Sequence, residues 1–362
     1  MKKIRLYKYL LLCIYVNCLL ADNKLFNCFE FLKIPLLLGA GLCVILLMID
    51  NRKVKEFVYQ VPLILFGLIN YYKTGNSWGL YSILLVLMGE NLPLNEALKS
   101  IFKLMLFVLC VNLFSFAWQY ATGATLTSLQ TTEHIRYAMG FPSPNFAAQF
   151  WSSLVFLYYF LYSKEFTKEK YLVIIIATFV FYYFTDSDAL VFILLIPIFS
   201  YLDMSFKFIQ IRKLATRFSF LFLWIFTFLL IHTKGILYVF FDQLFTGRLH
   251  LASLAFSEYN LTWLGQKVEM FRAITSGEDW SFLVVDNAFA YLSIYFGMFY
   301  LVLLSVVFIF NRNISNVRVQ LCIIMYALAA LAENNILSPY MIFPVLIAFN
   351  KQENFEILKY KD

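Results

Sequence analysis

The stretch FLKIPLLLGAGLCVILLMI, Phe31–Ile49, contains one charged residue, Lys33, and is otherwise almost wholly apolar. A helix needs about 20 mostly apolar residues to cross a bilayer, because its backbone N–H and C=O groups find no water partners in lipid. The stretch therefore predicts a membrane-spanning helix. The whole chain has the same character, since 62% of its 362 residues are hydrophobic and only 14% are charged, against about 25% in an ordinary soluble domain.

Further apolar runs of similar composition alternate with polar breaks along the chain, and several are shorter than a bilayer is thick. We expect an all-α polytopic integral membrane protein with about 12 transmembrane helices, forming one membrane domain over residues 1–362. The predicted spans lie near residues 7–21, 31–49, 57–72, 78–89, 100–118, 145–162, 171–185, 189–202, 218–232, 287–310, 319–333 and 340–350.

The basic residues predict how these spans are oriented. Short cytoplasmic loops of membrane proteins carry an excess of Lys and Arg. If the N-terminal MKKIRLYK is inside, the inner segments hold 21 of the 29 Lys and Arg. Both termini are therefore predicted to be cytoplasmic, in a multi-pass protein of the plasma membrane. This asymmetry and the anionic inner leaflet account for the formal charge of +7, so no nucleic-acid partner is implied.

A reporter that is active only outside the membrane can test this orientation. We expect activity when the reporter is fused after Gly123 or Gly277, because both lie in predicted outer segments. Fusions after Lys168 or Lys213, in predicted inner segments, should be silent. The reverse pattern would contradict the orientation and everything that depends on an outer site.

The N-terminal stretch has a second interpretation. Its basic start, apolar run and Ala21 near a cleavage point also resemble a secretory signal. Asn17 interrupts the apolar run and further spans follow, which favours an uncleaved first helix. The later loops keep their predicted sides under either interpretation.

Several chemistries find no support in the sequence. The six cysteines fall mostly inside predicted spans and lack metal-ligand spacing, so neither a disulfide framework nor a metal site is expected. There is no nucleotide-binding Walker loop and no sizeable soluble domain, which disfavours an ATP-driven pump. No cofactor is predicted.

The unusual polar residues gather in two long predicted outer segments, residues 119–144 and 233–286. All three histidines, His134, His232 and His250, lie in or beside these segments. Asp286 and Asn287 follow at the start of the next predicted span, where they can cap its helix. Any chemistry is therefore expected on the outer face.

Two arginines in these segments have a distinctive context. Arg136 comes shortly before GFPSPN, a turn that leads into the next span. Arg248 follows Gly247 at the predicted start of a helix, where backbone N–H groups favour an anion. Because the planar guanidinium can bind phosphate through two bonds, the pair predicts a phosphate-bearing ligand at the outer membrane surface.

The order of four motifs resembles a known family. RYAMGFPSPN is followed by TDSDAL after a span, by TGRLHLASLAF in the long outer segment, and by DNAFAYLSIYFG entering a span. Together with the late AENNILSPY, this order over residues 119–345 is similar to the O-antigen and capsular polysaccharide polymerases called Wzy. Many relatives carry Ser-Arg where this chain has Ser187 and Asp188, so no basic ligand is assigned there.

The resemblance implies a function. Such polymerases join oligosaccharide repeat units carried on undecaprenyl diphosphate, at the outer face of the bacterial cytoplasmic membrane. A GT-C-like arrangement of the helices is compatible with it. The implied partners are the lipid-linked oligosaccharide, the lipid bilayer, a flippase and a chain-length regulator. No nucleotide sugar is needed, in keeping with the missing nucleotide motifs.

This reaction makes two physical demands on side chains. Releasing a diphosphate develops negative charge, which fixed cations stabilise. We assign that role to Arg136 and Arg248, with Arg272 as a weaker third. A base can remove the proton of the acceptor hydroxyl. The candidates for the base are His250, His134 and Glu333, the last at the outer end of its predicted span.

Two rival functions stay open. A ligase similar to the O-antigen ligases, which hands a finished glycan to another acceptor, would use the same layout and the same donor chemistry. A flippase or other transporter would place polar residues within the spans, along a path. The predicted spans contain few charges, which ranks the transporter third.

Overall fold

The computed structural model describes residues 2–50, 54–123, 128–130, 135–162, 167–187, 193, 209–245, 247–268 and 285–351. Within these residues the regular structure is helical apart from one antiparallel hairpin, in which β1 (Ser128–Gln130) pairs with β2 (Ile135–Tyr137). Four helical stretches are long and apolar enough to cross a membrane: Lys2–Asp22, Cys28–Ile49, Leu94–Thr122 and Arg212–Thr233. The fold is all-α and fits a membrane protein, as expected, while the count of 12 spans stays a prediction.

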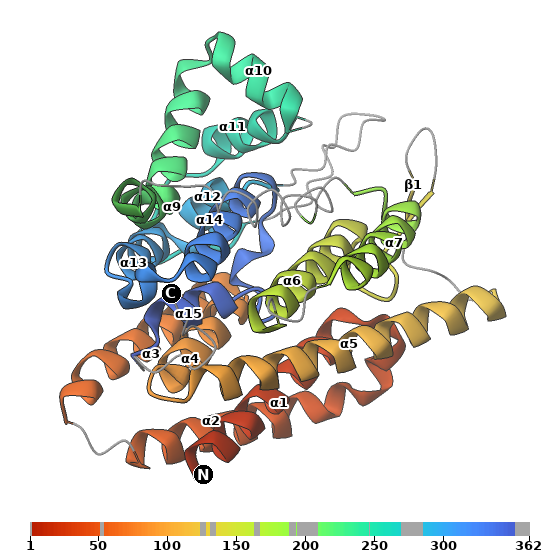
Figure 1. Cartoon of the computed structure of the whole chain (residues 1–362), viewed down its shortest axis with the longest axis vertical. Coiled ribbons are helices and arrows are strands. Elements are labelled where there is room, and N and C mark those ends of the chain that lie inside the picture. Colours follow the sequence, from red (N-terminus) through yellow and green to blue (C-terminus); the bar gives the residue numbers. More distant parts are fainter. Residues whose placement is uncertain are drawn as a thin grey trace.

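The helices occur in the order α1 (Lys2–Asp22), η1 (Lys24–Leu32), α2 (Lys33–Asp50), α3 (Val54–Thr74), α4 (Trp78–Gly89), α5 (Leu94–Thr122), α6 (Pro144–Tyr162), α7 (Lys168–Thr185), α9 (Ile209–Thr233), α10 (Ile236–Leu244), α11 (Arg248–Glu258), α12 (Ala288–Tyr291), η4 (Leu292–Phe296), α13 (Met298–Ile309), η5 (Arg312–Ser315), α14 (Val317–Ala332), η6 (Asn335–Leu337) and α15 (Phe343–Phe349). Figure 1 shows α1, α2 and α5 along one side, α10 and α11 at the opposite extreme, and α12 to α15 between them. The predicted span at residues 189–202 lies outside the described residues except for residue 193.

Helix α2 shows why a bilayer suits this fold. Its exposed face carries Leu38, Leu42, Ile45 and Ile49, and its buried face carries Ala40, Cys43, Val44 and Leu47. Both faces are apolar, whereas a surface helix in water has a polar face opposite its apolar one. The exposed side chains therefore match lipid better than water.

The predicted span at 287–310 is broken into α12, the π-helical turn η4 and α13. The break is at Gly297, which has a φ of 94°. A Cβ atom at this position would lie 2.4 Å from the backbone nitrogen of Gly265. The Asn70 side-chain amide donates to the carbonyls of Leu264 (2.9 Å) and Phe296 (2.6 Å) and holds the two segments together. This close approach of backbones requires glycine, and periodicity alone does not reveal it.

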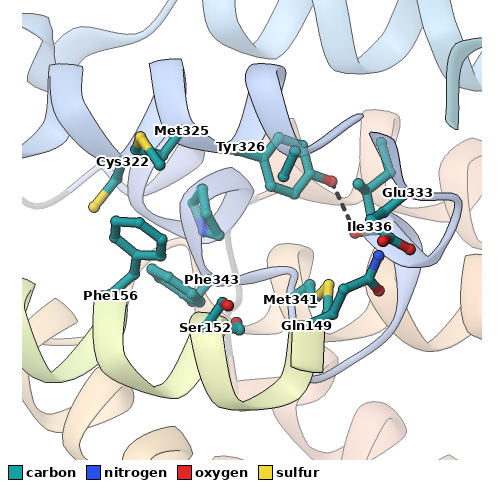
Figure 2. Close-up of a pocket in the computed structure, with 13 residues that line it drawn as sticks. Gln149, Ser152, Phe156, Cys322, Met325, Tyr326, Glu333, Ile336, Met341 and Phe343 are labelled. Carbon is teal, nitrogen blue, oxygen red and sulfur yellow. Dashed lines mark hydrogen bonds between the residues drawn. The ribbon is translucent and has the colours of Figure 1, made fainter. Parts of the chain in front are cut away.

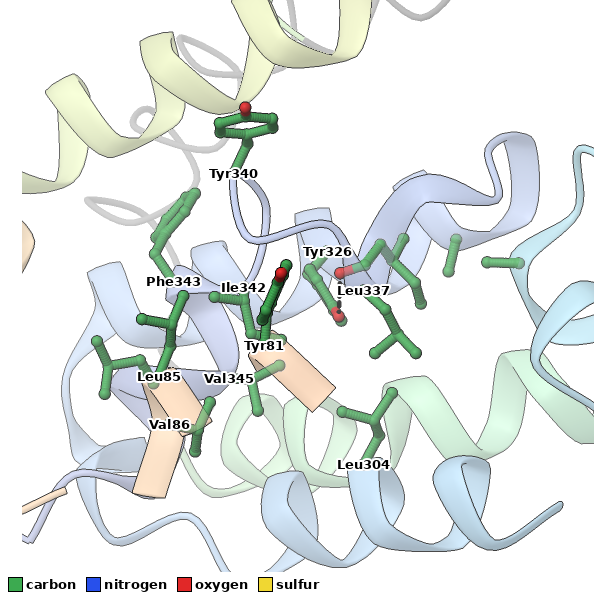
Figure 3. Close-up of a cluster of buried hydrophobic side chains, with 14 of the residues drawn as sticks. Tyr81, Leu85, Val86, Leu304, Tyr326, Leu337, Tyr340, Ile342, Phe343 and Val345 are labelled. Carbon is green, nitrogen blue, oxygen red and sulfur yellow. Dashed lines mark hydrogen bonds between the residues drawn. The ribbon is translucent and has the colours of Figure 1, made fainter. Parts of the chain in front are cut away.

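The turn after α14, residues 333–341, lies in the core. Three side chains from different helices donate to its carbonyls: Tyr15 to Pro339 (3.0 Å), Ser82 to Leu337 (2.5 Å) and Ser153 to Tyr340 (3.0 Å). Figure 3 shows side chains of this turn packed against those of α4, α13 and α14. The turn thus joins α1, α4 and α6 and fixes the position of the residues at its start.

At another place two predicted inner segments meet. The buried Glu90 carboxyl accepts a hydrogen bond from the Tyr59 hydroxyl, and Lys351 Nζ lies 3.4 Å from Glu90 Oε2. The Lys351 backbone N–H also donates to the Glu90 carbonyl (2.8 Å). Residues 90–99 and 351–362 are both predicted to be inner, so their contact is consistent with the charge pattern.

Candidate functional site

Arg248 and Glu333 form a buried ion pair. Arg248 opens α11, and Glu333 lies just past the end of α14. Arg248 Nη1 is 3.3 Å from Glu333 Oε1, with the side chains 11% and 2% exposed. A buried charge without a partner is costly, so each group makes the burial of the other tolerable. Sequence reasoning predicted both residues separately, and the structure brings them together.

Two further charged groups belong to this site. Burial raises the pKa of the Glu333 carboxyl above its ordinary value, and Arg248 and then Arg136 oppose that rise. Burial likewise raises the pKa of the Asp286 carboxyl above its ordinary value, and the positive charges of the same two arginines offset part of that rise. Both carboxyls lie outside the helices. Electrostatic interactions therefore link Arg136 and Asp286 to the Arg248–Glu333 ion pair.

The hydrogen bonds of Asn287 help to position its neighbour Asp286. The Asn287 side-chain oxygen accepts from the backbone N–H of Ala290 (3.0 Å) and caps α12, as predicted. Its amide nitrogen donates to the Leu331 carbonyl (2.9 Å) near the end of α14. One side chain thus starts a helix and brings Asp286 towards Glu333.

Arg136 lies on β2 and is partly buried. Its Nε donates to the Thr185 carbonyl at the end of α7 (2.9 Å), and its Nη2 donates to Asn145 Oδ1 near the start of α6 (2.7 Å). The guanidinium therefore ties three elements together while its charge acts on the Asp286 and Glu333 carboxyls. Arg136 has a structural role in addition to any role in binding.

The turn after β2 rests directly on α5. Gly140 has a φ of 84°, and a Cβ atom there would lie 2.4 Å from the Asn112 carbonyl oxygen. The Asn112 side chain in turn accepts from the Asn23 amide (2.6 Å) at the end of α1. Only glycine fits this approach without strain, so Gly140 helps fix the hairpin that carries Arg136.

His250 differs from Glu333 in its surroundings. Its backbone N–H donates to the Asp242 carboxylate on α10 (2.8 Å), and this contact caps the first turn of α11. The residue is exposed, whereas Glu333 is buried beside Arg248. The position of Glu333 beside Arg248 makes it the better placed of the two described base candidates.

A cavity of about 60 Å³ adjoins Glu333. Helices α6, α14 and α15 and the turn at 333–341 line it, as Figure 2 shows. Glu333 and Gln149 lie at one end, and Phe156, Cys322 and Phe343 lie at the other. The lining is mostly apolar, with Glu333 as its charged side chain and Gln149, Ser152 and Ser153 among its polar ones.

Two predicted site residues, His134 and Arg272, lie outside the described residues. Sequence reasoning missed Gln149 and Asn145, and it treated Asp286 only as a cap. Asn145 follows directly after Pro144 in the GFPSPN turn, so its place beside Arg136 had a local signal. Gln149 had none, because an isolated amide in an apolar helix is usually a packed residue.

Among the described residues no group of three His, Cys, Asp or Glu side chains could hold a metal ion. The site instead combines two guanidinium groups with the buried Glu333 carboxyl and the partly buried Asp286 carboxyl. Such a set can bind an anion through the arginines and accept or release a proton at a carboxyl.

A scan against protein-family models, a search of curated proteins and a search of solved structures each found no match. The chain's class therefore rests on its own features. It is an all-α protein with apolar helices suited to a membrane, and it carries a buried Arg248–Glu333 ion pair on which the charges of Arg136 and Asp286 act.

Proposed function

We propose that this protein is a polysaccharide polymerase that joins repeat units carried on undecaprenyl diphosphate at the outer face of the cytoplasmic membrane. The observation that carries the proposal is the Arg248–Glu333 ion pair, and the charge of Arg136 also acts on the Glu333 carboxyl. These residues come from the motifs whose order resembles the Wzy polymerases. A transferase that releases a diphosphate and deprotonates a hydroxyl needs this combination of cations and a base.

In the proposed reaction, the acceptor hydroxyl oxygen attacks the anomeric carbon of the growing chain. The bond from that carbon to the diphosphate oxygen breaks, and its electron pair leaves with the lipid diphosphate. Arg136 and Arg248 stabilise the negative charge that develops there. The acceptor proton passes to the Glu333 carboxylate. The products are a chain longer by one repeat unit and free undecaprenyl diphosphate.

The Arg248–Glu333 ion pair has a specific part in this scheme. With no diphosphate bound, Arg248 compensates the buried Glu333 carboxylate. When a diphosphate shares Arg248, the compensation weakens, and the carboxylate becomes a stronger base. Donor binding thus prepares Glu333 to take the proton.

The placement of the buried charges favours a transferase over a transporter. Among the described residues, Glu56, Glu90, Arg248, Arg318 and Glu333 are the buried charged side chains. Each lies near a helix end rather than at mid-helix. A transport path for an ion or a charged substrate is expected to place ionisable groups along the helices, within the membrane.

Deleting the gene in its host separates polymerase, ligase and transporter. Loss of a polymerase should abolish long polymer while single lipid-linked repeat units are still made and exported. Loss of a ligase would leave polymer attached to its lipid, and loss of a transporter would leave no outward-facing units. The measurement is the size and lipid attachment of the glycan in the deletion strain and in the complemented strain.

A further inference from the structure

The amide of Gln149 is an unmet donor beside the charged site. Gln149 is 5% exposed, and its Oε1 accepts a hydrogen bond from the Asn335 amide (3.0 Å). Its Nε2 has no hydrogen-bond partner within the part of the chain that the structure describes. Figure 2 shows the amide nitrogen directed towards Glu333 at the end of the cavity.

The Asn335 contact fixes which way this amide points. Because Oε1 is engaged by Asn335, Nε2 is the end that faces the cavity. A buried amide donor without a partner is costly, so a ligand group that accepts its hydrogen bond would stabilise this part of the cavity. Asn335 lies in the turn that follows Glu333, so one turn positions both polar groups.

A donor next to a carboxylate is complementary to a hydroxyl group. A hydroxyl has one hydrogen to donate and lone pairs that accept. The cavity limits the size of the ligand group, since its 60 Å³ is well below the roughly 150 Å³ of a cavity that holds benzene. A hydroxyl or hydroxymethyl group fits, and a whole sugar ring does not.

We propose that Gln149 and Glu333 form a subsite for one hydroxyl group of the acceptor sugar. Gln149 Nε2 donates to the hydroxyl oxygen, and the hydroxyl donates its hydrogen to the Glu333 carboxylate. The subsite rests on the proposed function, and it names Gln149 as a binding residue for the acceptor. The sugar ring stays outside the cavity, where the donor diphosphate meets Arg248.

The test compares Gln149→Met, which removes the donor at similar volume, with Met325→Leu, a volume-conserving change in the same cavity. The substrate is the lipid-linked repeat unit extracted from the deletion strain. We expect Gln149→Met to raise the acceptor concentration for half-maximal transfer about tenfold, as for one lost hydrogen bond. Met325→Leu should change it little. An unchanged acceptor dependence in Gln149→Met would overturn the subsite.

Two further arms keep the result unambiguous. If Gln149→Met fails to fold, Asn335→Ala, which frees the amide, should give a smaller loss in the same direction. If wild-type protein transfers nothing, the polymerase proposal fails by itself. The subsite is then tested by the affinity of the protein for the free repeat-unit oligosaccharide. An affinity about tenfold weaker in Gln149→Met than in wild type would support the subsite, and equal affinities would exclude it.

A different observation concerns α10. One face of this helix exposes Ile236, Leu237, Phe240 and Leu244, with fractions of 57% to 88%. The other face packs inward, where Phe241 meets Phe226 of α9 with ring centroids 5.2 Å apart. The apolar face is thus the one turned away from the protein.

We infer that α10 lies in the lipid interface with this face in the bilayer. Helix α10 follows closely after α9, which is long and apolar enough to cross a membrane and also exposes apolar side chains such as Phe222 and Leu229. Apolar faces of this kind enter the boundary between headgroups and acyl chains. Asp242 of α10 also caps the first turn of α11, so lipid contact at α10 sets the position of Arg248.

Tryptophan substitutions in nanodiscs test this placement without any activity assay. Phe240→Trp should add fluorescence to that of the six native tryptophans, and brominated lipids should quench the added emission. Ser257→Trp, at an exposed polar position on α11, should add emission that these lipids leave unquenched. Equal quenching of both variants, or none in either, would overturn the inference.

Discussion

Arg248→Ala is expected to lower the rate of glycan transfer by about 100-fold or more, the loss typical of removing one group that stabilises developing charge. Arg248→Lys should fall between Ala and wild type, because it keeps the charge but loses the planar two-bond fork. Arg136 should show the same order of Arg, Lys and Ala. The measurement is transfer by purified protein supplied with the lipid-linked repeat unit.

Controls separate lost chemistry from lost structure. Removing Arg248 leaves Glu333 buried without its ion-pair partner, which is destabilising. The double variant Arg248→Ala with Glu333→Gln has no unpaired buried carboxylate at this position, so its thermal stability should exceed that of Arg248→Ala. For Arg136, Asn145→Ala removes one hydrogen bond and leaves the charge in place. Full activity in both Arg136→Ala and Arg248→Ala would exclude the diphosphate site.

Glu333→Gln is expected to reduce turnover to a low residual rate while donor binding is retained. The substitution keeps size and hydrogen bonding and removes the proposed proton acceptor. His250→Gln is the matched comparison, because His250 is the other described base candidate and is exposed. We expect the His250→Gln variant to keep most of the wild-type activity. Loss of turnover in His250→Gln with a fully active Glu333→Gln would transfer the role of the base to His250.

The same assignment predicts a dependence on pH. Burial raises the pKa of Glu333, so the carboxyl takes up a proton at a higher pH than an exposed glutamate would. A base must be deprotonated, so activity should be present above the pKa of the folded state and should fall as the pH drops through it. The acidic limb of the rate profile should disappear in Glu333→Gln, leaving a low and flat residual rate. A wild-type profile without an acidic limb would contradict the assignment.

Local patterns predicted some helices closely. The predicted spans at 145–162 and 171–185 correspond to α6, Pro144–Tyr162, and α7, Lys168–Thr185. Each begins at a recognisable signal, Pro144 in the first turn of one and Thr167 capping the other. The last predicted span, 340–350, is reduced to the seven residues of α15. Its first part belongs to the buried turn, whose shape depends on side chains from α1, α4 and α6.

The candidate site was only partly visible in the sequence. Arg136 and Arg248 stood out because charged residues are scarce in so apolar a chain, and Glu333 stood out at the end of its span. Their meeting was not predictable, because spacing along a chain says nothing about which helix ends pack together. Gln149 became a site residue only through its neighbours Asn335 and Glu333.

Composition and run length determine the class of fold, whereas the tertiary structure determines which distant residues meet. An all-α fold suited to a membrane follows from composition and run length, since a backbone in lipid must satisfy its own hydrogen bonds within each segment. The Arg248–Glu333 pair, the break at Gly297 and the direction of the Gln149 amide depend on groups far apart in the chain. Packing alone brings such groups within reach, because contacts of a few ångströms are set by how whole helices fit together.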